Sequence, residues 1–224
     1  MGKPWIVFGG WAISPRILQP VFGEESVYLD VNEMMPLLFD EERLIENWVD
    51  VVKKKIAGYL AMDVAGIAGW STGAIMACGL AQLVQVKRLC LLSATPSFCR
   101  REGFRSGQRP AIIQAMIREL KEKENTVVSD FMVQCGLAER KIFSKLYDKQ
   151  TLIKGLMFLE KANLVGMVKK TECETLVVHG RDDRVIPYLA GEALAGMIGA
   201  ECKLLDGGHA FFTDRCDEVK RIIE

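Results

Sequence analysis

A serine in a glycine-flanked turn is the residue with the clearest chemical potential in this chain. The run Gly69-Trp70-Ser71-Thr72-Gly73 follows an apolar stretch over residues 63–69 that predicts a buried strand, and an apolar helix is predicted over 74–84. A sharp turn between strand and helix holds its serine hydroxyl clear of the sheet, at a helix N-terminus where developing negative charge is favoured. We therefore predict that Ser71 is a nucleophile.

A serine hydroxyl attacks a carbonyl only when an adjacent base takes its proton, and that base needs an orienting acid. The chain has two histidines. His179 falls at the end of a predicted strand and is interpreted as a packed structural residue, whereas His209 follows two glycines after the last predicted strand and is preferred as the base. Either Asp182 or Asp183 could accept the imidazole N–H.

The negative charge of a tetrahedral intermediate requires two fixed N–H donors. The amide of Thr72, directly after the nucleophile, is one candidate, and the amide of Trp11, after Gly9-Gly10, is the other. A tight turn explains the two glycines equally well. The side chains of Trp11 and Trp70 are candidate walls for an acyl chain, with core packing as the competing interpretation.

Strands and helices alternate along most of the chain. Strands are predicted over 5–8, 26–31, 63–69, 87–95, 174–179 and 200–205, and helices over 14–22, 40–59, 74–84, 188–198 and from 214. This alternation predicts an α/β fold with a mainly parallel sheet of about six strands flanked by helices. Ser71, both aspartates and His209 each follow a predicted strand, so we expect them at one edge of the sheet.

Residues 97–165 interrupt the alternation after the fourth strand. Helices are predicted there over 111–124, 127–135, 139–147 and 150–162, which indicates a helical cap inserted into a single domain spanning 1–224. Four arginines gather near the start of this segment, namely Arg100, Arg101, Arg105 and Arg109. They are candidate substrate-binding residues, with a solvated loop as the alternative.

Composition excludes several classes of protein. Half of the residues are apolar, about a quarter are charged and the formal net charge is zero, so charge gives no reason to expect a nucleic-acid or membrane partner. The seven cysteines are scattered without a C-x-x-C pair, which argues against a disulfide framework or a zinc site and fits a cytoplasmic protein. We expect no metal, no signal peptide and no membrane span.

Four motifs, in their order and spacing, resemble the α/β-hydrolase superfamily: Gly9-Gly10-Trp11, the Ser71 turn, the run 179–187 and Gly208-His209-Ala210-Phe211. Within it the chain looks most like the pimeloyl-[acyl-carrier protein] methyl ester esterases of biotin synthesis, through the runs 93–99 and 155–159 that flank the cap. In that family the acid lies four residues before a proline, which implies Asp183 here. Gly9-Gly10 departs from the family's usual His-Gly.

The resemblance implies a serine carboxylesterase that needs no cofactor and hydrolyses a small acyl ester carried on an acyl carrier protein, which the cap arginines would meet. Ser71, Asp183 and His209 would form the catalytic triad. A generic short-chain carboxylesterase or a thioesterase is the nearest alternative. A non-catalytic hydrolase-fold binding module, or a lyase using the same three residues, belongs to other classes.

Overall fold

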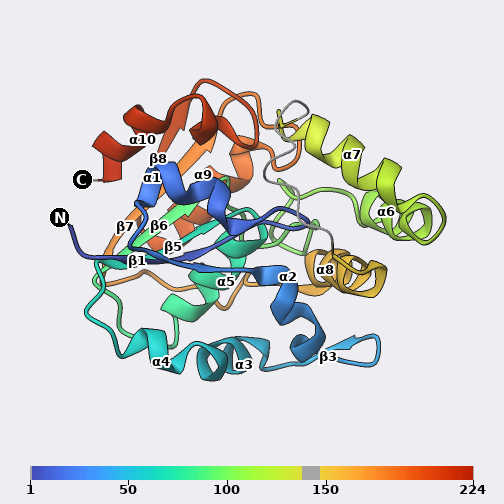
Figure 1. The fold of residues 1–224 in the computed structure, drawn as a ribbon, viewed down its shortest axis with the longest axis horizontal. Helices are drawn as coiled ribbons and strands as arrows, with labels where there is room; N and C mark the ends of the chain where they lie inside the picture. The colour runs from blue at the N-terminus through green and yellow to red at the C-terminus, as the bar shows by residue number, and fades with distance from the viewer. Residues whose placement is uncertain (1, 138–146, 224) are drawn as a thin grey trace.

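The computed structural model describes residues 2–137 and 147–223, and they form one six-stranded sheet with a separate two-stranded hairpin. The strands of the large sheet are β1 (Trp5–Phe8), β2 (Val27–Leu29), β5 (Gly66–Trp70), β6 (Arg88–Leu92), β7 (Glu174–Gly180) and β8 (Glu201–Leu205). Their order is β2-β1-β5-β6-β7-β8, and every neighbouring pair is parallel (Figure 1). The predicted parallel sheet of about six strands is confirmed.

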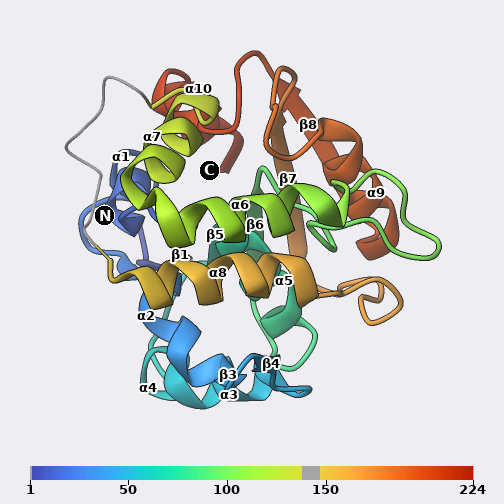
Figure 2. The same cartoon turned by 90° about the vertical axis from the view of Figure 1, so that its right-hand side faces the viewer.

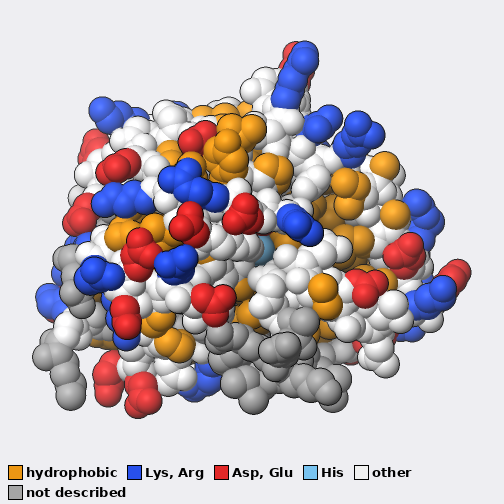
Figure 3. All heavy atoms as spheres, turned by 90° about the horizontal axis from the view of Figure 1, so that it is seen from above, with side chains coloured by type: hydrophobic (Ala, Val, Ile, Leu, Met, Phe, Trp, Pro, Cys, Tyr) orange, Lys and Arg blue, Asp and Glu red, His pale blue; other side chains and the backbone are white. Residues whose placement is uncertain are grey.

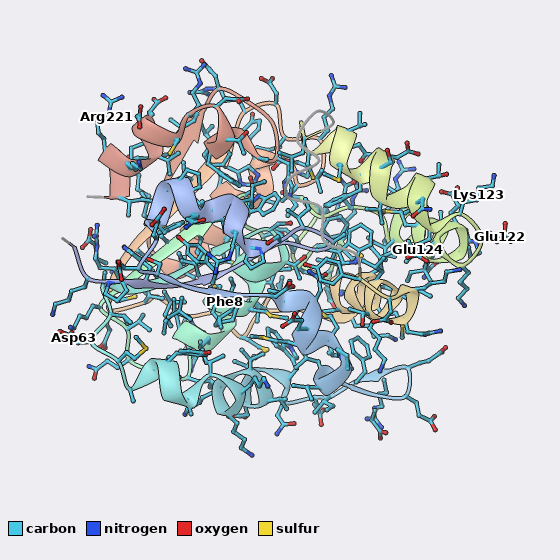
Figure 4. The ribbon with its side chains drawn as sticks, viewed as in Figure 1. Phe8, Asp63, Glu122, Lys123, Glu124 and Arg221 are labelled. Atoms are coloured by element: carbon cyan, nitrogen blue, oxygen red, sulfur yellow. The ribbon has the colours of Figure 1, made fainter. Side chains whose placement is uncertain are left out.

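Helices on both faces bury the centre of the sheet, as a parallel sheet requires. Helices α1 (Gln19–Phe22) and α10 (Cys216–Ile223) contact one another on one face, and α3 (Trp48–Lys55) and α5 (Thr72–Ala81) on the other (Figure 1). Every residue of β1 and β5 is buried. Phe8 lies in the middle of the layers with no exposed surface (Figure 4).

The described part of the interval between β6 and β7 contains three helices. They are α6 (Pro110–Glu122), α7 (Glu124–Gln134) and α8 (Lys149–Lys161). Figure 2 shows α6 and α8 side by side across the end of the sheet, and the two helices contact each other. These helices match the predicted segments 111–124, 127–135 and 150–162, whereas most of the helix predicted over 139–147 lies outside the described residues. The assignment of 97–165 as an inserted cap stays a prediction.

The helix predicted over 40–59 is wrong in its first half. Strands β3 (Phe39–Asp40) and β4 (Arg43–Leu44) pair there as an antiparallel hairpin, in which Asp40 lies opposite Arg43. Glu41 adopts a φ of 51°, a left-handed turn conformation that no helix accommodates. The helical pattern holds only from α3 onward, continued by α4 (Ala57–Leu60).

The remaining elements are short connections and one longer helix: η1 (Pro15–Leu18), α2 (Val31–Met34), η2 (Met35–Leu38), α9 (Tyr188–Ile198) and η4 (Phe211–Thr213). No helix within residues 2–137 and 147–223 has the length and apolar character needed to cross a membrane.

The glycines of the Ser71 turn let three backbones approach closely. A Cβ at Gly73 would collide with the carbonyl groups of Phe8 and Gly9, at the end of β1, and a Cβ at Gly69 would collide with the backbone of Gly73. Backbone atoms cannot give way as a flexible side chain can. The join between β1, β5 and α5 therefore requires glycine at both positions.

We predict that Gly73→Ala lowers the free energy of unfolding by about 1–3 kcal/mol, because the added methyl group overpacks this join. The matched control is Gly196→Ala in α9, where a Cβ would meet no atom within 4 Å. Alanine at this exposed helical position should raise the free energy of unfolding by about 0.5–1 kcal/mol. Urea denaturation measures both, and effects of the same sign would contradict the prediction.

Candidate active site

Ser71 sits at the junction of β5 and α5 in a strained backbone conformation. Its φ of 57° and ψ of −120° are rare for a residue other than glycine, and its amide donates to the carbonyl of Leu92 at 3.1 Å. Thr72 begins α5 directly afterwards. The serine is nearly buried, with 4% of its surface exposed, so its hydroxyl meets only a small and defined set of groups.

Two loops from distant parts of the chain bring His209 and Asp183 to that hydroxyl. His209 Nε2 lies 2.9 Å from Ser71 Oγ, and His209 Nδ1 lies 2.8 Å from Asp183 Oδ2. The carboxylate can only accept, so we assign hydrogen to Nδ1, which leaves Nε2 to accept from the serine hydroxyl. The structure thus brings together the three residues predicted for the triad, whereas Asp182 is exposed and its amide donates to Gly207.

The carboxylate of Asp183 is buried but well supplied with donors. Its Oδ1 accepts from the amides of Val185 and Ile186, each at 2.8 Å, and its Oδ2 faces both histidines. Burial acts to raise the pKa of Asp183, but the His209 charge and the hydrogen bonds from His179 and His209 outweigh burial, so this pKa lies below its usual value. The acid therefore stays ionised beside the imidazole.

Two side chains hold the backbone of His209 in place. Its carbonyl oxygen accepts from Trp70 Nε1 and from Ser93 Oγ, each at 2.9 Å. The Trp70 ring also lies 5.3 Å from the imidazole, tilted by 42°. Trp70 is fully buried and is not among the described residues that line the cavity beside Ser71. It therefore supports His209 and does not form a wall for the substrate.

A buried asparagine, which the sequence analysis missed, shapes the loop that carries Trp11. Asn32 accepts from the amide of Ala12 at 3.0 Å and donates to the carbonyl of Gly10 at 3.2 Å. Asp30 orients Asn32, and the hydroxyl of Tyr147 donates to Asp30 at 2.7 Å. Within the part of the chain that the structure describes, the amides of Trp11 and Thr72 donate no hydrogen bond. Both remain candidate donors to a substrate.

A cavity of about 190 Å³ opens beside Ser71. Its walls are mainly apolar and come from the Trp11 loop, α6, α7, α8 and the turn after β7; they include Trp11, Phe98, Ile113, Phe131, Leu156 and Val185. The Trp11 indole is fixed, because its Nε1 donates to Leu152 at 2.9 Å and its ring packs edge-on against Phe131. The cavity suits a short aliphatic group.

The charged side chain in this lining is Arg184, not one of the four predicted arginines. Arg100 donates to Gly107, within its own loop. Arg101 donates to Ser97 and to the carbonyl of Glu160, so it joins this loop to α8. Arg105 and Arg109 are exposed. The signal that could have identified Arg184 was its position directly after the candidate acid.

Other features of the described residues lie away from this site. A larger surface groove of about 570 Å³, between the β3–β4 hairpin, α6 and α8, contains lysines and glutamates but none of the three triad candidates. Residues 2–137 and 147–223 contain no group of three or more metal-ligating side chains placed to hold an ion. All seven cysteines carry free thiols.

Comparison with known proteins identifies a family and several relatives that this chain resembles. The model of the "Alpha/beta hydrolase family" matches residues 19–222. A "Pimeloyl-[acyl-carrier protein] methyl ester esterase" of Stenotrophomonas maltophilia (strain R551-3) is 29% identical over 171 residues, which cover 70% of this chain and 66% of that protein. One of the same name from Xanthomonas axonopodis pv. citri (strain 306) is 28% identical, covering 100% of this chain and 94% of the relative.

A solved structure shares the fold. An esterase from Exiguobacterium antarcticum superposes with a TM-score of 0.76 at 17% identity, covering 99% of this chain and 90% of that one. The fold therefore recurs in a protein of very different sequence.

We predict that Asp183 makes acid unfolding steeper than it would otherwise be. Because the pKa of Asp183 is lower in the folded state than the usual value of about 3.9, its stabilisation is fully present above that pH and is lost as the pH falls further. Asp183→Asn should therefore unfold with a shallower pH dependence below pH ~4. Urea denaturation at several pH values measures this, and parallel curves for the two proteins would contradict it.

Proposed function

The chain belongs to the alpha/beta hydrolase family, and on this basis we propose that it is a serine carboxylesterase acting through Ser71, His209 and Asp183. The observation that carries the proposal is the pair of hydrogen bonds, 2.9 Å and 2.8 Å long, that joins serine to imidazole and imidazole to carboxylate. This arrangement can remove a proton from the hydroxyl as it attacks.

Acylation begins when Ser71 Oγ attacks the ester carbonyl and His209 Nε2 takes the hydroxyl proton. Asp183 accepts the Nδ1–H and stabilises the imidazolium that forms. The amides of Trp11 and Thr72 donate to the oxyanion of the tetrahedral intermediate. Collapse of this intermediate breaks the bond to the leaving alcohol, which receives the proton from His209 Nε2, and leaves an acyl group on Ser71.

Deacylation repeats these steps with water. His209 Nε2 takes a proton from water as its oxygen attacks the acyl carbonyl, and the second tetrahedral intermediate releases the carboxylic acid. The proton returns from His209 to Ser71 Oγ. No metal ion or organic cofactor takes part in this cycle, because the side chains already named carry every proton.

The substrate we propose is pimeloyl-[acyl-carrier protein] methyl ester, hydrolysed to pimeloyl-[acyl-carrier protein] and methanol as a step of biotin synthesis. The names of the relatives and the apolar cavity support this choice. Residues 97–165 would act as the cap, with Arg105 and Arg109 meeting the acidic carrier. Figure 3 shows basic and acidic side chains interspersed on the face it displays, so that face offers the carrier no broad basic surface.

A generic short-chain carboxylesterase is the second candidate. The small, mainly apolar cavity favours it, because such a cavity accommodates a short acyl group without any carrier. The two candidate functions share the same chemistry at Ser71. They differ in whether the substrate is attached to a carrier protein that binds outside the cavity.

Replacement of the nucleophile tests the chemistry. We predict that Ser71→Ala lowers kcat for release of acid from pimeloyl-carrier methyl ester by roughly 10⁴-fold or more, because no other group forms the acyl intermediate. Circular dichroism and thermal unfolding check that the fold is retained. Turnover by the folded variant within tenfold of the wild type would sink the mechanism.

Replacement of Arg105 and Arg109 tests whether these arginines recognise an acyl carrier protein. We predict that Arg105→Gln combined with Arg109→Gln raises KM for pimeloyl-carrier methyl ester about tenfold and leaves hydrolysis of p-nitrophenyl butyrate unchanged. The matched control is Arg221→Gln, at the far end of α10 from α6 and α8 (Figure 4). Equal effects on both substrates, or none, would favour the generic esterase.

A further inference from the structure

His179 is a second imidazole in contact with the candidate acid. It lies in β7, one residue before the end of the strand, and has no exposed surface. Its Nε2 is 2.8 Å from the carbonyl oxygen of Ile186 and 3.2 Å from Asp183 Oδ2. The residue interpreted from sequence as structural packing therefore contacts the carboxylate that faces His209.

These contacts fix the tautomer of His179. Both neighbours of Nε2 are acceptors, so we assign the hydrogen to Nε2, which donates to the carbonyl while the carboxylate oxygen lies 3.2 Å from the same nitrogen. Nδ1 is buried and has no hydrogen-bond partner among the described residues. It packs against α9 at Gly191, where even a Cβ would collide with it, so the ring has no room to turn away from Asp183.

Asp183 Oδ2 consequently faces two imidazole N–H groups. His209 Nδ1 is the nearer at 2.8 Å and His179 Nε2 the farther at 3.2 Å. A carboxylate oxygen that already accepts one hydrogen bond carries less charge for the next donor. The His179 donor therefore weakens the attraction that Asp183 exerts on a proton held by His209.

We propose that His179 is a positioning residue that holds Asp183 Oδ2 in line with His209 and lowers the basicity of His209 by sharing the charge of that oxygen. This inference rests on the proposed function, in which His209 is the base. Its consequence is that His209 remains a proton acceptor to lower pH than it would beside an unshared carboxylate.

The other groups that face Asp183 do not supply this effect. The Cys135 thiol lies near the acid at the end of α7, and burial, with a smaller contribution from the charge of Asp183, raises its pKa well above the usual value, which keeps it uncharged. Asp182 and Arg184, the chain neighbours of Asp183, are exposed. Among the described residues, the two imidazoles are thus the titratable donors to this carboxylate.

Two substitutions of His179 separate the donor from the space it fills. In His179→Gln the side-chain amide can place an N–H where Nε2 lies, whereas His179→Met has similar bulk and no donor. The readout is the acid limb of kcat/KM against pH for p-nitrophenyl acetate, a small neutral ester. We expect the midpoint of that limb to rise by about half a unit to one unit in His179→Met and to return close to the wild-type value in His179→Gln.

A second readout does not depend on turnover. NMR titration of the His209 ring in Ser71→Ala, with and without His179→Met, should show the same upward displacement. If the wild type hydrolyses no ester but this displacement is present, the proposed function fails and the role of His179 stands.

An unchanged midpoint of the acid limb in His179→Met would overturn the inference, because a purely structural residue would lower kcat without moving that midpoint. An equal displacement in His179→Gln and His179→Met would also overturn it, because the effect would then not depend on the N–H donor. If His179→Met does not fold, His179→Asn replaces it, since its amide is too short to reach Oδ2.

Discussion

A buried carboxylate must be met by donors, and the candidate site is built around that requirement. Asp183 receives two backbone amides on one oxygen and two imidazoles on the other. Without these donors the cost of burial would favour the protonated acid, which has no negative charge to stabilise an imidazolium at His209. The turn after β7 supplies the two amides and β7 itself supplies His179, all within a few residues of the acid, so much of its electrostatic environment is local in the sequence.

The rest of the site depends on contacts between loops that follow different strands. The carbonyl of His209 accepts from Trp70 at the end of β5 and from Ser93 just after β6, so the base, which follows β8, is fixed by residues at the ends of two central strands. Asn32, after β2, holds the loop that follows β1. A parallel sheet makes these contacts possible because it brings the carboxyl ends of all its strands to one edge.

Sequence reasoning reached the elements whose signals are local. A strand, a glycine turn and a helix around Ser71 are recognisable from a dozen residues, and the order of motifs singled out His209. Long-range partners leave no such signal. Nothing in the sequence around Trp70 indicates that its N–H holds His209, Asn32 looks like any polar residue after a strand, and the β3–β4 hairpin depends on the left-handed turn at Glu41, which overrides the helical pattern. The four arginines were chosen by charge alone, and charge does not reveal that Arg101 donates to its own loop.

The central claim is that His209 activates Ser71 as a nucleophile, and covalent labelling tests it most directly. The wild-type protein and His209→Ala would be treated with a fluorophosphonate, and the modified peptide identified by mass spectrometry at timed intervals. We expect one label per chain, on Ser71, formed roughly 10²-fold or more slowly when the imidazole is absent. Labelling elsewhere, no labelling of the wild type, or equal rates in the two proteins would contradict it.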